Sequence, residues 1–223
     1  MSETAKRQLP VWQESILLVV IAMVMAVVVK AFFLQAFYIP SESMEPTMLV
    51  DDKILVQKVS YWTGEPDRGD VVVFDDPGGW LDTSQSREAS NAVQEVLEVV
   101  GLFPTGGHLI KRVVGVGGDR VTCCDDQGRL SVNGESLDEP YLLDPTANAD
   151  SRFDVEVPEG YLWVQGDNRG NSADSRAHQG DPGGGFIPVE SVVGKAWFRV
   201  WPYKRIGFLR DAQAFEQVPA TAP

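Results

Sequence analysis

A single apolar run near the N-terminus constrains this chain more than any other feature of its sequence. Every residue from Ile16 to Val29 is apolar, and beyond Lys30 the run continues to Leu34. Coiled as a helix, residues 16–34 would span roughly 28 Å at 1.5 Å per residue, close to the hydrocarbon thickness of a bilayer. We therefore expect a transmembrane helix over residues 15–37.

A cleavable signal peptide is the alternative interpretation, with Lys6 and Arg7 as its charged start. The segment Leu34-Gln35-Ala36 has a large residue at its first position, where a cleavage site needs a small one, so an uncleaved anchor is favoured. The two cations favour a cytoplasmic N-terminus. We expect residues 1–14 in the cytoplasm and residues 38–210 as a domain outside the membrane.

The sequence beyond the anchor predicts short β-strands bounded by Gly, Pro, Asp or Asn and rich in β-branched or aromatic residues. These strands are expected at residues 71–74, 109–116, 129–132, 154–157, 161–165 and 192–201. Asn133-Gly134 fits a two-residue hairpin turn, because both positions tolerate positive φ. The expected fold class is mainly β, with one membrane helix followed by an antiparallel β-sandwich or barrel-like domain.

Two further segments are expected to differ from this β domain. Residues 78–107 are bounded by glycine pairs, and the apolar residues between them recur at helical spacing, which predicts an inserted helical excursion. Its apolar face could pack on the parent domain or on a partner. Residues 211–223 are expected to form a flexible tail.

The charge and the metal-binding residue types argue against two classes of function. A net charge of −13 does not suit a nucleic-acid binder, which needs a basic surface to neutralise phosphates. The chain has two histidines, and its two cysteines, Cys123 and Cys124, are adjacent, which is not a zinc-site spacing. We expect no metal, no cofactor and no nucleic acid. The cysteines could form a disulfide or remain buried thiols.

Two serines, Ser41 and Ser43, directly follow the apolar run and are candidate nucleophiles. A serine hydroxyl needs a base to remove its proton. His108 or His178 could complete a Ser/His/Asp arrangement, but no serine of this chain lies in a Gly-x-Ser-x-Gly turn. Lys111 is the stronger candidate for the base.

Lys111 lies inside a run of β-branched residues. The period of two in a strand places it on the same face as Leu109 and Val113. If that face is buried, the lysine loses solvation, its pKa falls, and it can accept a proton near neutral pH. A surface lysine at a strand edge is the alternative that the spacing allows.

A polar stretch from Gly166 to Arg176 follows the strand expected at residues 161–165. Its Asp, Asn and Ser side chains could cap the backbone of their own loop or orient catalytic groups. The sequence leaves both interpretations open.

Four ordered motifs closely resemble those of bacterial type I signal peptidases. They read Ser-x-Ser-Met-x-Pro-Thr, Arg-Gly-Asp-Val-Val, Lys-Arg-Val-Val-Gly and Gly-Asp-Asn-Arg-x-Asn-Ser-x-Asp-Ser-Arg, at residues 41–47, 68–72, 111–115 and 166–176. The resemblance covers the chain from about residue 10 to residue 205. It implies a membrane-bound serine endopeptidase of peptidase family S26.

The resemblance also implies a role for each matching residue. Ser43 would be the nucleophile and Lys111 the general base. The Ser41 hydroxyl and the Ser43 backbone N–H would form the oxyanion hole. Ser172 would orient the lysine.

The last motif adds a structural ion pair, Asp174 with Arg176, beneath the site. The chain departs from the family pattern at Glu42, where glycine is commoner, at Gly117, where the family often has proline, and at Gly170, where it often has aspartate. None of the three is a proposed catalytic group.

The implied substrates are preproteins, cleaved after the Ala-x-Ala end of a signal peptide. Residues 41–44 and 70–74 would line shallow pockets for the small side chains of that site. The enzyme would be a monomer in the plasma membrane, in contact with lipid and functionally linked to the protein-export channel.

Two rival functions are also compatible with the sequence. A self-cleaving repressor shares Ser/Lys chemistry, but it needs a DNA-binding domain, whereas this chain has an anchor and an acidic balance. A non-enzymatic, membrane-tethered β domain would leave Ser43 and Lys111 merely structural.

Overall fold

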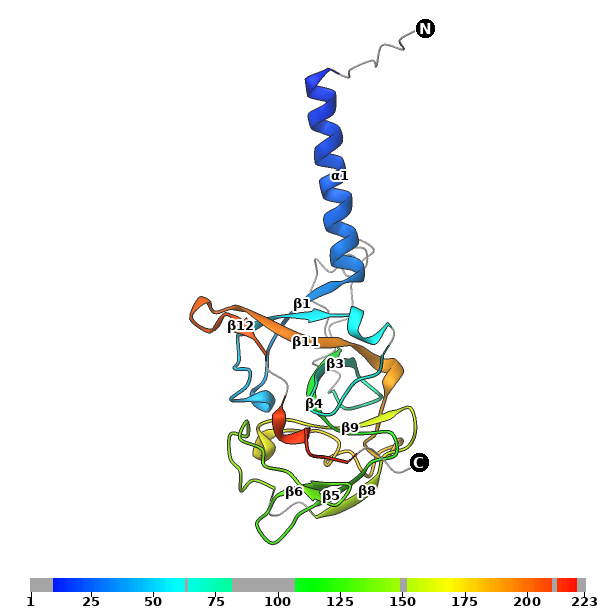
Figure 1. Ribbon diagram of the computed structural model, residues 1–223, viewed down its shortest axis with the longest axis vertical. Coiled ribbons are helices and arrows are strands. Elements are labelled where there is room, and N and C mark those ends of the chain that lie inside the picture. Colours follow the sequence, from blue (N-terminus) through cyan, green and yellow to red (C-terminus); the bar gives the residue numbers. More distant parts are fainter. Residues whose placement is uncertain (1–9, 63, 82–106, 149–151, 210–211, 220–223) are drawn as a thin grey trace.

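The computed structural model describes residues 10–62, 64–81, 107–148, 152–209 and 212–219, and within them a long helix projects from a β domain (Figure 1). This helix, α1, spans Val11–Phe32 and contains neither Gly nor Pro. From Val11 to Val29 it is long and apolar enough to cross a membrane, and its side chains are exposed. An apolar helix without a protein partner is stable where lipid is its solvent.

The predicted end of the membrane helix, residue 37, is wrong. The helix stops at Phe32, and Leu34–Tyr38 forms strand β1, which pairs antiparallel with β2, Lys53–Gln57. Pairing with a neighbouring strand satisfies the backbone groups of these residues, so the apolar run divides into a helix and an edge strand.

Among the described residues the β domain contains an eight-stranded and a four-stranded sheet, and every pairing is antiparallel. The large sheet has the order β1-β2-β11-β3-β4-β9-β10, with β12 paired to β11. Its other strands are β3 Val71–Asp75, β4 His108–Val116, β9 Tyr161–Gln165, β10 Ile187–Pro188, β11 Val192–Trp201 and β12 Gly207–Phe208.

The small sheet has the order β7-β6-β5-β8. Its strands are β5 Arg120–Cys123, β6 Leu130–Val132, β7 Glu135–Ser136 and β8 Phe153–Glu156. Asn133 and Gly134 join β6 to β7 with φ of 54° and 85°, so the predicted hairpin turn is present. The mainly β fold class is confirmed, and each strand expected from the sequence overlaps an observed one.

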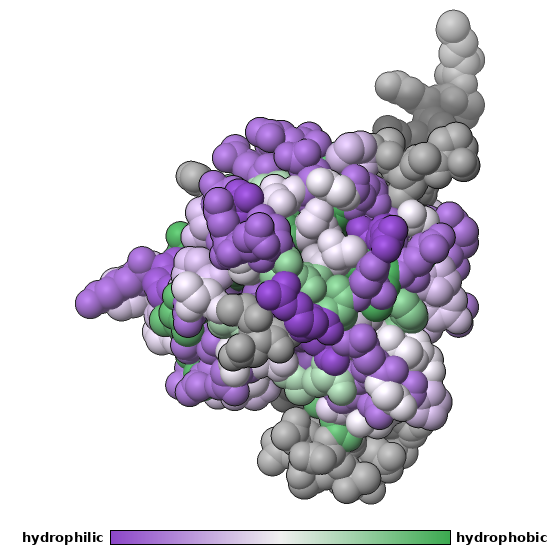
Figure 2. Space-filling view, turned by 90° about the horizontal axis from the view of Figure 1, so that it is seen from below, coloured by the Kyte–Doolittle hydropathy of each residue, from purple (hydrophilic) through white to green (hydrophobic). Residues whose placement is uncertain are grey.

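The core positions the segment between β1 and β2. Met44 and Met48 of that segment are fully buried in a cluster with Ile54, Val73 and Ala196 of β2, β3 and β11. The polar side chains lie mainly outside this core, and the face of the molecule away from the helix is largely hydrophilic (Figure 2).

The expectation of a flexible tail is wrong for residues 212–219. Gln213–Phe215 forms a 3₁₀ turn, and Phe215 and Val218 are buried in the core between the two sheets with Leu130 and Trp163. Apolar burial of these two side chains fixes the segment, although the sequence around them has no strand or helix pattern.

Two other expectations concern the insertion and the cysteines. Most of the predicted helical excursion, residues 82–106, lies outside the described residues. The start of that excursion is a turn, in which Asp76 accepts backbone hydrogen bonds from Gly78, Trp80 and Leu81. Cys123 and Cys124 are joined by a disulfide bond.

Candidate active site

Ser43 lies in a 3₁₀ turn, Glu42–Met44, directly after β1 and at the surface of the core that holds Met44. The side of the turn is held by the polar loop that follows β9. Asn168 donates its backbone N–H to the carbonyl of Ser43 at 3.0 Å and its side-chain amide to the carbonyl of Glu42 at 3.2 Å. These bonds direct the Ser43 hydroxyl toward the large sheet. Ser43 as a whole is 7% exposed.

Lys111 reaches Ser43 from the middle of that sheet. It lies in β4, between β3 and β9, and is only 4% exposed. Its Nζ is 2.9 Å from Ser43 Oγ, which is hydrogen-bond distance. Two residues that are 68 positions apart in the chain thus meet in a buried pair.

Burial changes the acidity of this lysine. The pKa of Lys111 falls from 10.5 to about 8, mainly because burial removes its solvation. The carboxylates of Asp174 and Asp167 raise this pKa, and the positive charge of Arg176 lowers it. A lysine with such a pKa is largely neutral in mildly alkaline solution. A neutral amine at 2.9 Å from a serine hydroxyl can accept its proton.

Ser41 lies beside the pair. Its Oγ is 3.3 Å from Ser43 Oγ, and its backbone is extended. The two histidines that could have acted as the base contact carboxylates instead. His108 contacts Asp75 and His178 contacts Asp181, each at 2.7 Å.

Ser172 and the Asp174–Arg176 pair lie on the loop after β9. Asp174 is fully buried and accepts hydrogen bonds from Arg176 Nε at 2.9 Å and from the Gly166 N–H at 3.1 Å. Burial opposes its ionisation, but the bonds from Arg176 outweigh this and lower the pKa of Asp174. The buried Ser172 hydroxyl lies near Asp174 and helps lower that pKa, but within the described residues it has no hydrogen bond of good geometry, to Lys111 or any other group.

Gly166 is required by close packing at this point. A Cβ on residue 166 would collide with Ser172 Oγ and with the carbonyl oxygen of Ser43. Glycine therefore allows the loop after β9 to approach the Ser43 turn.

Comparison with known proteins assigns the site to a family. Residues 12–201 match the model of the family described as signal peptidase, peptidase S26. The chain belongs to this signal peptidase family. It is therefore a serine endopeptidase, and membership excludes both the self-cleaving repressor and the non-enzymatic β domain.

The relatives of this signal peptidase cover most of the chain. A probable signal peptidase I of Mycobacterium leprae is 42% identical over 92% of this chain and 81% of that protein. The signal peptidase I of Mycobacterium tuberculosis is 44% identical over 89% of this chain and 76% of that protein. A probable signal peptidase I-2 of Synechocystis is 36% identical over 93% of this chain and 81% of that protein.

A solved structure of a signal peptidase I from Enterococcus faecalis aligns with a TM-score of 0.39 at 28% identity, over 59% of this chain and 97% of that chain. The family assignment rests on the sequence matches alone.

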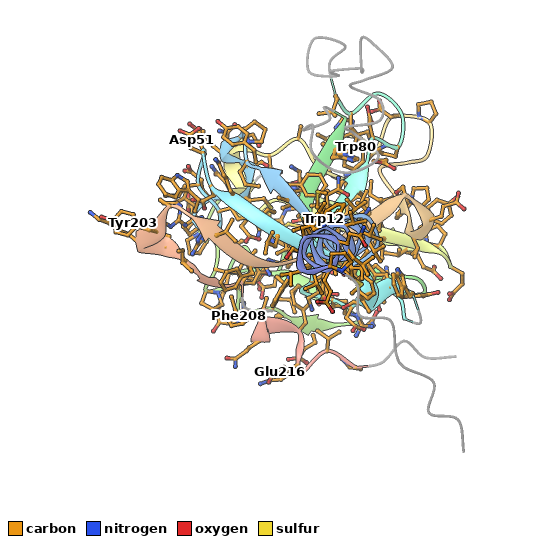
Figure 3. The ribbon with its side chains drawn as sticks, turned by 90° about the horizontal axis from the view of Figure 1, so that it is seen from above. Trp12, Asp51, Trp80, Tyr203, Phe208 and Glu216 are labelled. Atoms are coloured by element: carbon orange, nitrogen blue, oxygen red, sulfur yellow. A yellow bond between two sulfur atoms is a disulfide. The ribbon has the colours of Figure 1, made fainter. Side chains whose placement is uncertain are left out.

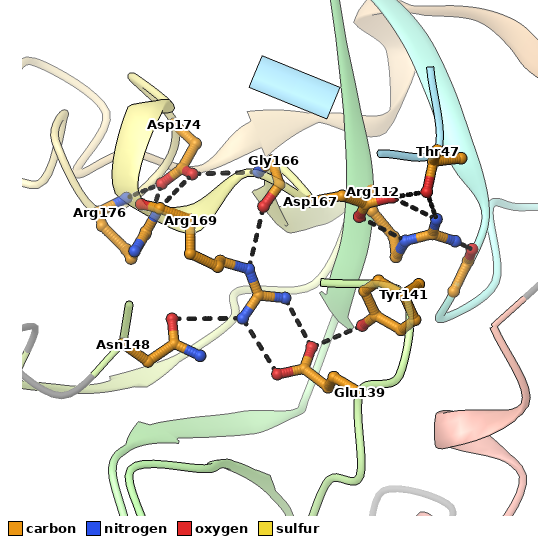
Figure 4. A network of polar contacts seen from close by, with 11 residues as sticks. Thr47, Arg112, Glu139, Tyr141, Asn148, Gly166, Asp167, Arg169, Asp174 and Arg176 are labelled. Atoms are coloured by element: carbon orange, nitrogen blue, oxygen red, sulfur yellow. Dashed lines mark hydrogen bonds and ion pairs between the residues drawn. The ribbon is translucent and has the colours of Figure 1, made fainter. Parts of the chain in front are cut away.

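A buried polar network behind the Ser43–Lys111 pair of the signal peptidase was not expected from the sequence (Figure 4). Arg112, on the opposite face of β4 from Lys111, binds Asp167 with Nε and Nη2 at 2.8 and 2.6 Å. Asp167 also accepts the Thr47 hydroxyl at 2.5 Å. Asp167 therefore connects β4 to the segment that carries Ser43.

The network continues to the small sheet's side of the molecule. Arg169 donates to Glu139 at 2.6 and 3.1 Å and to the carbonyl of Gly166 at 3.0 Å. Tyr141 donates to Glu139 at 2.5 Å, and its ring lies 4.2 Å from the Arg112 guanidinium carbon. Buried ion pairs and hydrogen bonds of Arg169 therefore fix the position of the loop after β9.

One sequence signal could have identified part of this network. An arginine within a β-branched run must be paired if it is buried, and the loop after β9, whose residues 166–176 include two aspartates, is the obvious source of a partner for Arg112. Nothing in the sequence marks Glu139 or Tyr141, because they lie in an irregular segment without a motif.

The strand predicted to line substrate pockets is buried, as Ser43 and Lys111 are. Val71, Val72, Val73 and Phe74 are all buried, and Asp70 binds Lys195 at 2.6 Å. The lining of pockets by this strand stays a prediction.

Within the described residues no group of three or more His, Cys, Asp or Glu side chains could hold a metal ion.

Proposed function

We propose that this signal peptidase cleaves preproteins by attack of Ser43 on the peptide bond that follows the signal peptide, with Lys111 as the general base. The observation that carries the proposal is the buried contact of 2.9 Å between Lys111 Nζ and Ser43 Oγ. A base with a pKa near 8 is well matched to removal of a serine proton at neutral to alkaline pH.

The proposed reaction has two halves. Neutral Lys111 takes the proton of Ser43 as Oγ bonds to the carbonyl carbon. The resulting ammonium protonates the leaving amine as the C–N bond breaks, which leaves an acyl ester on Ser43. Water then loses a proton to Lys111 and attacks the ester. As the C–Oγ bond breaks, the Lys111 ammonium returns that proton to Ser43 Oγ, and the signal peptide leaves with a new carboxylate.

The oxyanion that forms in each half needs donors placed in advance. We assign this role to the backbone N–H of Ser43 and to the hydroxyl of Ser41, whose oxygen lies 3.3 Å from Ser43 Oγ. Donors fixed before the reaction stabilise the developing charge without reorganisation. Ser172, Asp174 and Arg176 would act indirectly by holding the surroundings of Lys111.

We also propose that the catalytic domain lies on the outer surface of the plasma membrane. α1 would span the bilayer over its apolar length, with residues 1–14 in the cytoplasm. The rings of Phe33 and Trp62 lie 5.4 Å apart where α1 meets the β domain, and exposed aromatic residues favour the membrane interface. This arrangement places Ser43 close to the point where a substrate's signal peptide leaves the bilayer.

The oligomeric state, the link to protein export and the division of the chain belong to the same proposal. The enzyme would act as a monomer, functionally linked to the protein-export channel. It would divide into the cytoplasmic segment, the anchor, an outer domain that begins at β1 and includes residues 212–219, and the inserted segment of residues 78–107.

The position of the cut tests the substrate assignment. We expect the enzyme in liposomes to cleave a preprotein after an Ala-x-Ala site, and mass spectrometry of both products should locate one bond. Replacing either small residue of that site by Trp should lower kcat/KM at least about tenfold, because a shallow pocket does not accept a large side chain. Cleavage elsewhere, or equal cleavage of the Trp variants, would contradict the proposal.

A further inference from the structure

Two arginines contact the segment that carries Ser43. Arg199 lies near the end of β11, and Arg205 ends a 3₁₀ turn, Tyr203–Arg205, in the connection to β12. Their side chains are 15% and 24% exposed, so both are largely enclosed. Arg199 Nε donates to the carbonyl of Arg205 at 2.6 Å, which joins the two arginines into one unit.

Both arginines bind the same backbone carbonyl. Arg199 Nη1 donates to the carbonyl oxygen of Thr47 at 2.8 Å. Arg205 Nη2 lies 3.3 Å from the carbonyl oxygen of Pro46 and 3.5 Å from that of Thr47. Hydrogen bonds from two guanidinium groups to consecutive carbonyls restrict the path of the backbone at this point.

The same arginines share one buried carboxylate, that of Asp52. Asp52 is 1% exposed and accepts both Nη1 bonds of Arg205, at 2.9 and 3.0 Å. Arg199 Nη1 lies 3.6 Å from it. Asp52 also accepts the backbone N–H of Leu49 at 2.9 Å, so its carboxylate closes the turn that ends the Ser43 segment.

Thr47 connects this arginine pair to the catalytic groups. Its carbonyl faces the arginines, whereas its hydroxyl donates to Asp167 at 2.5 Å. The next residue, Met48, donates its N–H to the carbonyl of Met44 at 2.9 Å, which ties Thr47 to the turn that contains Ser43. A shift at Thr47 would therefore move the nucleophile.

We propose that Arg199 and Arg205 are positioning residues that hold Ser43 within reach of Lys111 through the Thr47 carbonyl and the Asp52 carboxylate. The inference rests on the proposed role of Ser43 as nucleophile. Displacing a nucleophile by about 1 Å can cost about 100-fold in rate. The planar fork of arginine binds the carboxylate and the carbonyls together, whereas the single ammonium of a lysine cannot.

Lys204 provides a matched control from the same turn. Its Nζ lies 5.9 Å from the ring centre of Tyr203, and Figure 3 shows Tyr203 at the outer tip of the β11–β12 connection, away from the helix axis. We expect Arg205→Ala to lower kcat at least about tenfold and Arg205→Lys to lower it less, each with KM within about twofold of wild type. Lys204→Ala should leave both constants unchanged.

The pH profile separates positioning from a general loss of structure. In folded Arg205→Ala the midpoint of kcat against pH should stay where wild type has it, because Lys111 keeps its surroundings. Combining Arg205→Ala with Asp52→Asn should reduce kcat little beyond the larger single effect, since both changes break one contact.

A wild-type kcat in folded Arg205→Ala, or an equal loss in Lys204→Ala, would overturn the inference. If Arg205→Ala does not fold, a wild-type kcat in Arg205→Lys would overturn it instead. Ser43→Ala, measured beside these variants, distinguishes the two levels of the account. Retained activity there would refute the proposed function itself, whereas an inactive Ser43→Ala with a fully active Arg205→Ala would refute the positioning role alone.

Discussion

At the scale of single residues, Lys111 is buried, and its charged form is therefore poorly solvated. Its pKa falls to about 8 because burial removes its hydration, and the carboxylates of Asp174 and Asp167 limit that fall. The two opposing effects leave the amine largely neutral in mildly alkaline solution. The acidity of Lys111 is thus set mainly by its burial and moderated by the neighbouring charges.

The rate should follow the neutral fraction of Lys111. Below the pKa, kcat/KM should rise about tenfold per pH unit, and it should level off above about pH 8 to 9. Asp174→Asn removes a charge that stabilises the ammonium form, so the midpoint should move to lower pH. Peptide cleavage assayed from pH 6 to 10 measures both effects.

A flat profile between pH 6 and 9 would argue against a lysine base. Asp174→Glu is the control, because it keeps the negative charge. Its midpoint should stay nearer that of wild type than the midpoint of Asp174→Asn.

The sequence predicts single residues well when a motif or a period marks them. The strand period marked Lys111 as a residue of one face, although only the resemblance distinguished a buried lysine from a surface one. Arg112 was not singled out from the sequence, because its importance comes from Asp167, which lies 55 positions away. A contact at that separation is a property of the folded chain.

At the scale of elements, the loop after β9 is held by charges rather than by apolar contacts. Arg169 and Glu139 are both nearly inaccessible, with side chains 0% and 3% exposed. A buried pair adds little to stability over an apolar pair, but removing one partner leaves an uncompensated charge. The fixed position of this loop therefore depends on each partner's presence.

Glu139→Gln should lower the free energy of unfolding by about 3 kcal/mol, because Arg169 would stay buried without its counter-charge. Denaturant unfolding of the enzyme in detergent measures the change. Asp154→Asn, which breaks the exposed pair with Arg120, serves as the control and should have no measurable effect. Equal losses in the two variants would contradict a special role for the buried pair.

The elements that the sequence failed to predict are those fixed by tertiary contacts. The strands at residues 161–165 and 192–201 were predicted because their composition alone favours β structure. Residues 34–37 were assigned to the helix, because an apolar run does not show where a neighbouring strand, here Lys53–Gln57, will pair with it. The tail was predicted as flexible because two isolated apolar residues, Phe215 and Val218, give no periodic signal.

At the scale of the whole molecule, an apolar helix leads directly into an acidic β domain, and Ser43 follows this junction closely in the sequence. β1 follows α1 directly, and Ser43 follows β1 after a few residues. The apolar side of this junction includes a cavity of about 470 Å³, lined by α1 and the first two strands.

The most direct test of the account is the rate of preprotein cleavage in liposomes by four proteins: wild type, Ser43→Ala, Lys111→Met and the double variant. If Ser43 and Lys111 act as one unit, all three variants should fall to the same background, at least about 1,000-fold below wild type, while their melting temperatures show that they are folded. Substantial turnover by folded Ser43→Ala or Lys111→Met would contradict the account.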